Sequence, residues 1–105
     1  MTYDELEQSL KARKFFGLSP GQWKLTSALM VREQLQLQQI YPILWPNPDD
    51  EPAEPAELIR AQMHRARARM KDKGLVINLV WGRGYYMTKE DRAKAIELAR
   101  KAMEA

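Results

Sequence analysis

The sequence predicts an α+β domain that is mainly helical, with a three-helix core followed by a β-hairpin and an extra helix at each end. Three observations predict this fold class. A chain of 105 residues is long enough for a single domain and too short for two ordinary ones. Amphipathic helical repeats fill most of its length. Near the C-terminal end, two short apolar runs flank the turn Val80-Trp81-Gly82-Arg83-Gly84, which is typical of a hairpin.

Composition narrows the classes of protein to which the chain could belong. A hydrophobic share of 45% is normal for a globular core and argues against a disordered chain. The sequence has no apolar run long enough for a transmembrane helix, and its N-terminus does not resemble a secretory signal. It also has no cysteine, which excludes disulfides and thiolate metal sites. We therefore expect a cytoplasmic protein.

Residues 1–17 are expected to form one N-terminal helix. Thr2 begins a capping-box pattern at its start, and Gly17 is suited to end it. Leu6 and Leu10 fall on the same face at helical spacing, so both are predicted to lie on the apolar side of this helix.

The first helix of the core has the clearest start in the sequence. Ser19 is the expected N-cap, and Pro20 follows at the first helical position, where its missing N–H has little cost. Gln22 completes a capping box. The apolar spacing carries this helix to about Glu33.

The next segment is expected to hold a short strand, a short helix and a loop. Leu35–Leu37 alternates apolar and polar residues, which is compatible with a strand. Gln38–Trp45 is predicted to be a helix that Pro42 distorts. Residues 46–55 are acidic and rich in proline, so a loop without regular structure is expected there.

A long basic helix is predicted between Glu57 and Lys73, with Gly74 after its end. The charge changes sign abruptly here, because residues 46–57 contain five acids and no base, whereas residues 60–73 contain six bases and one acid. Such a basic stripe is typical of a protein that binds polyanions, although a solvated helix face explains it equally well. The inward stripe of the helix is predicted to consist of Ile59, Met63, Ala66 and Met70.

The hairpin is expected between Leu75 and Met87, with strands at Leu75–Leu79 and Tyr85–Met87. Thr88 then caps a C-terminal helix over residues 89–105. Residues 18–88 would therefore form the core, and three helices followed by a hairpin are the arrangement of a winged helix. The apolar side of the C-terminal helix is predicted to carry Ala93, Ile96, Ala99 and Met103.

Three segments carry a likeness to a known family. They are Leu18–Leu25, Ile59–Met70 and Ile77–Met87, and the Gly82-Arg83-Gly84-Tyr85 run in the last segment is the most specific part. In these segments the chain resembles the DNA-binding domain of OmpR/PhoB-type response regulators. It is similar above all to stand-alone bacterial and phage relatives of that domain, which have no receiver domain.

The resemblance implies that helix 57–73 enters the DNA major groove and that hairpin 75–87 is a wing on the minor groove. Gln62 would pair with adenine and Arg65 with guanine, while the later cations of the helix would contact phosphates. The full set of expected DNA-contacting residues is Ala61, Gln62, Arg65, Arg67, Arg69, Lys71 and Arg83.

One basic residue and one aromatic residue, Arg83 and Trp81, lie at the tip of the expected wing. Arg83 could enter a narrow minor groove, where the negative potential is enhanced. Trp81 could stack on a base, but a hairpin tryptophan more often closes the core, and we expect it to do so here. His64, the one histidine of the chain, has no partners at metal-ligand spacing and is expected on the surface of the basic helix.

The sequence therefore indicates a sequence-specific transcriptional regulator that binds double-stranded DNA. The alternative is a winged-helix protein-interaction module, without specific DNA binding, that contacts RNA polymerase or another regulator. In the family, the loop equivalent to residues 46–55 can touch RNA polymerase. A homodimer is expected through Leu6 and Leu10 or through Ile96 and Met103. No catalytic, cofactor or metal site is predicted, so we expect no enzyme.

Overall fold

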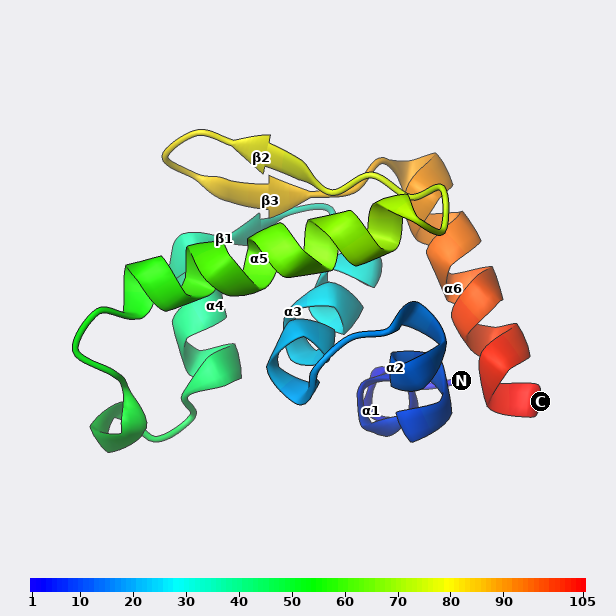
Figure 1. Cartoon of the computed structure of the whole chain (residues 1–105), viewed down its shortest axis with the longest axis horizontal. Coiled ribbons are helices and arrows are strands. Elements are labelled where there is room, and N and C mark those ends of the chain that lie inside the picture. Colours follow the sequence, from blue (N-terminus) through cyan, green and yellow to red (C-terminus); the bar gives the residue numbers. More distant parts are fainter.

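A computed structural model describes all 105 residues and shows a mainly helical α+β fold with a small three-stranded sheet (Figure 1). This confirms the predicted α+β class with mainly helical content. The elements in chain order are α1 (Tyr3–Gln8), α2 (Leu10–Phe16), α3 (Pro20–Met30), β1 (Leu35–Gln36), α4 (Leu37–Leu44), the 3-10 turn η1 (Pro48–Asp50), α5 (Pro55–Lys71), β2 (Asn78–Val80), β3 (Gly84–Tyr86) and α6 (Lys89–Glu104).

The N-terminal segment forms two short helices, so the prediction of one helix over residues 1–17 is wrong. Ser9 ends α1 and is the N-cap of α2, where its Oγ accepts a hydrogen bond from the backbone N–H of Ala12 (3.1 Å). A serine side chain offers the backbone this alternative to a continuous helix. The break separates the two leucines, because Leu6 is fully buried while Leu10 is 51% exposed. Gly17 ends α2 with φ 70°, as predicted.

Helix α3 lies at the centre of the core. Its predicted capping box is present, with Gln22 N donating to Ser19 Oγ (3.2 Å) and Ser19 N donating to Gln22 Oε1 (3.1 Å). Eight of its 11 residues are buried, because α1, α4, α5 and α6 all pack against it. The helix ends at Met30, before the predicted Glu33, since the chain leaves it to bring Leu35 into the sheet.

Helix α4 follows β1 directly and includes Pro42 without a break. The proline is exposed and the helix is short, so few backbone hydrogen bonds are lost. Ile40 is the one fully buried residue of α4. The acidic loop 46–55 contains the turn η1, although no regular structure was expected there. Asn47 caps that turn by accepting a hydrogen bond from the N–H of Asp49 (3.0 Å).

Helix α5 crosses over α3 and is the longest helix of the chain (Figure 1). It begins at Pro55 and ends at Lys71, within two residues of the predicted bounds. Gly74 takes φ 76° just beyond its end, which fits the predicted stop. All four residues of its predicted inward stripe are buried, namely Ile59, Met63, Ala66 and Met70.

The sheet is antiparallel, with the strand order β1-β3-β2. Strand β2 is shorter than predicted, since residues 75–77 pair with no strand, and β3 begins and ends one residue earlier than predicted. Leu75 and Ile77 are instead buried in the core, and the N–H of Val76 donates to Asp91 in α6 (3.0 Å). The base of the hairpin is therefore held by packing and by α6, and β1 joins it to the rest of the fold.

Two glycines shape the hairpin tip in different ways. The N–H of Arg83 closes the turn on the carbonyl of Val80 (2.9 Å), and Gly82 has the positive φ of 74° that a type II turn requires at its third position. A Cβ on Gly82 would contact nothing. Gly84 has φ 153°, and a Cβ there would overlap the backbone of β1 at Leu35. Gly84 therefore allows β1 and β3 to approach.

Helix α6 packs against α2 and α3 and covers that side of the core (Figure 1). Thr88 caps it as predicted, accepting a hydrogen bond from Asp91 N (3.1 Å). Its fully buried residues are Ala95 and Ala99. The prediction that Ala93 lies on the apolar side is wrong, because this residue is exposed. No helix of the fold combines the length and apolar character needed to cross a membrane.

Candidate nucleic-acid interface

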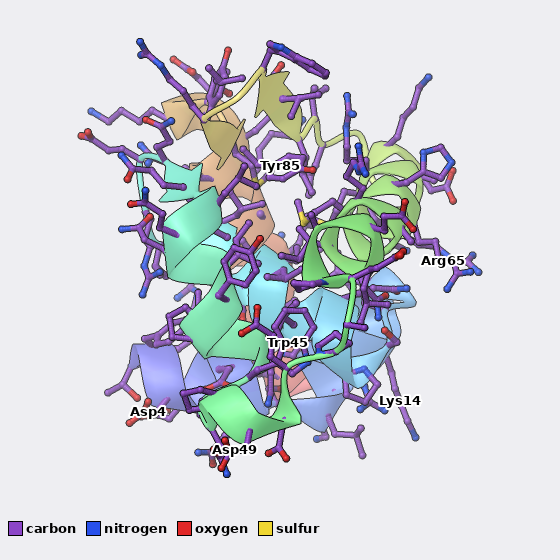
Figure 2. The ribbon with its side chains drawn as sticks, turned by 90° about the vertical axis from the view of Figure 1, so that its left-hand side faces the viewer. Asp4, Lys14, Trp45, Asp49, Arg65 and Tyr85 are labelled. Carbon is purple, nitrogen blue, oxygen red and sulfur yellow. The ribbon has the colours of Figure 1, made fainter.

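The exposed side of α5 carries two small residues between two sets of cations. Ala61 and Ala68 are exposed opposite the buried stripe, about two helical turns apart. Arg69 lies on the α3 side, with its Cδ 3.7 Å from the position of a Cβ on Gly17. Arg65 shares that side at one-turn spacing, and Figure 2 shows it pointing away from the protein. On the hairpin side lie Arg60, Arg67 and Lys71.

Arg67 ties α5 to the base of the hairpin. Its Nε donates a hydrogen bond to the carbonyl of Ile77 (3.0 Å), while its two Nη groups bond to no other protein group. A guanidinium has five N–H donors, so those that remain are available to a phosphate. The structure therefore gives Arg67 a positioning role, in addition to the phosphate contact that the sequence predicts.

Gln62 lies against α3. Gln22 Nε2 donates to Gln62 Oε1 (3.0 Å), and the Gln62 side chain is half-buried. Reading an adenine requires both the oxygen and the nitrogen of the amide to face the base, whereas this hydrogen bond holds the oxygen toward Gln22 of α3. In this arrangement Gln62 holds α5 against α3, while its exposed neighbour Ala61 faces outward.

Two grooves on the hairpin side of α5 have only basic groups among their charged lining residues. One has a volume of about 540 Å³ and lies between α5 and residues 75–77, and it is lined by Arg67, Lys71 and the exposed His64. The other, of about 350 Å³, lies between α4, α5 and the hairpin, and its one charged residue is Arg60. The second groove is otherwise mostly apolar.

A third groove lies at the hairpin tip and is polar. It has a volume of about 500 Å³, and Arg83 is its one charged lining residue. None of the three grooves is lined by a carboxylate, although the chain contains 14 aspartates and glutamates. The charged groups that line these grooves are thus all basic, and the carboxylate that is hydrogen-bonded to the hairpin, that of Asp91, lies at its base. The polar lining of the tip groove comes from Gln34, Gln36 and Gln38.

The acidic loop 46–55 lies away from these grooves. Asp49 and Tyr85 are at opposite ends of the view in Figure 2, and the same separation of loop and hairpin is visible in Figure 1. Glu57 is the acid of α5 nearest the loop, in the first turn, where the helix dipole favours a carboxylate. The acidic residues of the loop therefore leave the basic side of α5 unneutralised.

Tyr85 connects the hairpin with two of these arginines. It is buried between the hairpin and α5 (Figure 2). Burial raises the pKa of its phenol, and the nearby charges of Arg67 and Arg60 act in the opposite direction. The arginines thus lie close enough to Tyr85 to act on it electrostatically, which places their positive charge beside the hairpin.

The hairpin tip carries two exposed side chains. Arg83 is exposed, as its predicted role requires. Trp81 is 88% exposed, so the prediction that it closes the core is wrong. The tip extends beyond the core, and the hairpin residues that do cover the core are Leu75, Ile77, Tyr85 and Met87. The alternation of apolar and polar residues along the strands could not reveal the exposure of Trp81, because it does not show how far the hairpin extends beyond the core.

The expected homodimer surfaces are mostly occupied within the monomer. Leu6 is fully buried, so it is unavailable to a second copy and that part of the prediction is wrong. Ile96 and Met103 are half-buried and pack against the core. Leu10 is the one residue of the four that is largely exposed.

Alanine at Arg67 should reduce the free energy of unfolding by about 1 kcal/mol, because a partly buried hydrogen bond to the hairpin is lost. Alanine at Lys71 should change it by less than about 0.5 kcal/mol, since Lys71 is exposed and makes no hydrogen bond in the protein. Urea unfolding of the two variants checks this, and equal stabilities would show that the contact with Ile77 has no role in holding the hairpin.

The arrangement is a basic helix beside a hairpin whose one charged residue is Arg83, with the acidic loop 46–55 away from the hairpin (Figure 1). Comparisons with protein families, with curated proteins and with solved structures found no match to this chain.

Proposed function

We propose that the protein is a winged-helix transcriptional regulator that binds double-stranded DNA, with α5 as the recognition helix and the β2–β3 hairpin as the wing. The order α3, β1, α4, α5, β2, β3 supports this fold, as does a sheet in which β3 lies between β1 and β2. The likeness of three segments to OmpR/PhoB-type DNA-binding domains supports it as well.

The observation that carries the proposal is the distribution of charge around α5 and the hairpin. DNA presents about one negative charge per 1.7 Å of its axis, so a surface that binds it needs cations without nearby carboxylates. The three grooves beside the hairpin have cations and no carboxylate in their lining, and the Asp91 carboxylate beside one of them is already hydrogen-bonded to the N–H of Val76. A module that binds only proteins has no comparable reason to keep carboxylates out of all three.

The shape of the exposed side of α5 is suited to a major groove. Ala61 and Ala68 are short enough to let the helix backbone approach the base edges closely. The cations on the two flanks would then reach the phosphates on either side of the groove, which fixes the register without reading sequence. Arg65 is exposed and makes no contact within the protein that would occupy its guanidinium, so it is the best candidate for reading a base.

Selection from random DNA, followed by a salt titration of the selected duplex, tests this function. The logarithm of the binding constant should fall linearly with the logarithm of salt concentration, because phosphate contacts release counterions. Absence of binding to any duplex at low salt would reject the proposal. Binding to RNA polymerase through the exposed acidic loop 46–55, without DNA binding, would instead favour the protein-interaction module.

Arg65→Ala should cost about 1–3 kcal/mol of binding free energy on the selected duplex and much less on random DNA, because a bidentate contact to one base is lost. Arg69→Ala, one turn away on the same flank, is the matched control and should weaken binding to both duplexes equally. Competition between labelled and unlabelled duplexes measures both. An equal loss for Arg65→Ala on the two duplexes would make Arg65 a phosphate contact.

A further inference from the structure

Trp81 is the most exposed large apolar side chain of the protein, at 88%. Tryptophan is among the residues that folded proteins bury most on average, so this exposure is unusual. The turn that holds Trp81 does not require an indole, since its second position accepts most residues and the positive φ falls on Gly82. Folding of the monomer therefore does not explain why a tryptophan is present at the tip.

The other two tryptophans have partners within the fold. Trp23 is 2% exposed and its Nε1 donates to the carbonyl of Glu7 (2.8 Å). Trp45 is half-buried and lies against Tyr41, with 6.2 Å between the ring centroids. Trp81 has neither a hydrogen bond nor an aromatic neighbour, so its ring is unpartnered in the free protein.

The surroundings of Trp81 are electrostatically suited to a polyanion. The apolar groove that it borders contains Arg60 as its one charged residue, and the groove on the other side of the tip contains Arg83. Gly82 lines both grooves and separates Trp81 from Arg83 in the turn. An indole and a guanidinium are thus presented together from the tip, with no carboxylate lining the grooves on either side.

We infer that Trp81 is a DNA contact of the wing, whose indole enters the minor groove as an apolar wedge beside the guanidinium of Arg83. The inference rests on the proposed function and adds a residue and a preference to it. Apolar side chains that enter the minor groove insert between neighbouring base pairs and partly unstack them. Arg83 favours the narrow groove of an A·T-rich tract, and the wedge favours a flexible TA step within that tract.

The test uses the full chain and a short A·T-rich duplex with a central TA step. Trp81 should dominate acrylamide quenching of the fluorescence, because Trp23 is buried and Trp45 is half-buried. Adding the duplex should reduce quenching to the level of the Trp81→Ala variant. Trp81→Ala should bind this duplex about tenfold or more weakly, as loss of one base–aromatic contact predicts, and Trp81→Phe should retain most of the affinity. Leu10→Ala removes a distant exposed apolar side chain and should bind like the wild type.

Fluorescence anisotropy of the labelled duplex separates this inference from the proposed function. If the duplex binds while Trp81 stays fully quenchable and Trp81→Ala keeps its affinity, the inference is overturned and DNA binding by α5 stands. If no duplex binds at low salt, the proposed function fails and the inference fails with it. Protection of Trp81 that grows with protein concentration in the absence of DNA would overturn the inference in favour of an interface with a second copy.

Discussion

Replacing Gly84 with alanine should destabilise the protein by about 3 kcal/mol or more, which is a large effect for one methyl group. The added Cβ would overlap the backbone of Leu35 in β1, and φ at this position is 153°. Backbone atoms of a paired strand cannot move aside as a flexible side chain can, so β1 and β3 would have to separate. Because β1 joins the hairpin to the core, the variant should also lose its DNA affinity.

Gly82→Ala is the matched control for this change. Gly82 also has a positive φ, of 74°, but a Cβ there would meet no neighbouring atom. Only the backbone strain remains, which costs about 1–2 kcal/mol for a residue with a side chain. Urea unfolding compares the two variants. Equal losses of stability would mean that the close approach of β1 to Gly84 has no role in the fold.

Reversing two charges on opposite flanks of α5, with Arg69→Glu and Lys71→Glu together, should weaken DNA binding by about a hundredfold or more at moderate salt. Both residues are exposed, and they belong to the two sets of cations that would face the two phosphate strands. The slope of the salt dependence should fall by about two units, one for each lost phosphate contact. Electrophoretic mobility shifts at several salt concentrations would measure both quantities.

A second double variant controls for net charge. Lys94→Glu with Lys101→Glu makes the same change in charge on exposed positions of α6, away from the hairpin tip (Figure 1). It should reduce affinity only slightly, through the overall field of the protein. If this pair weakens binding as much as the pair on α5, DNA binding would depend on total charge and would not be localised to α5.

The sequence predicted best those features that depend on neighbouring residues. The caps at Ser19 and Thr88 and the buried stripe of α5 all follow from spacing within a few residues, and all three predictions are confirmed. Ser9 shows the limit of that reasoning. Its side chain could either face solvent within one helix or break the helix by capping the next, and the periodicity did not distinguish the two.

The candidate site depends on contacts between distant parts of the chain, which no local pattern reveals. Gln62 is predicted as a base-reading residue from its place on α5, but its oxygen is bound by Gln22, 40 residues earlier. The bond between Arg67 and Ile77 joins a helix to a hairpin in the same way. Exposure of Trp81 likewise depends on how far the tip projects beyond the core.

The most direct test of the central claim is a titration of ¹⁵N-labelled protein with the selected duplex, followed by NMR. We expect the amide shifts to change most along the exposed side of α5, at Ala61, Arg65 and Ala68, and at Gly82 in the wing tip. The amides of α1 and α6 should change little. Shifts concentrated on α6 or on the acidic loop 46–55, with α5 unperturbed, would contradict the proposal that this basic helix and its hairpin form the DNA-binding surface.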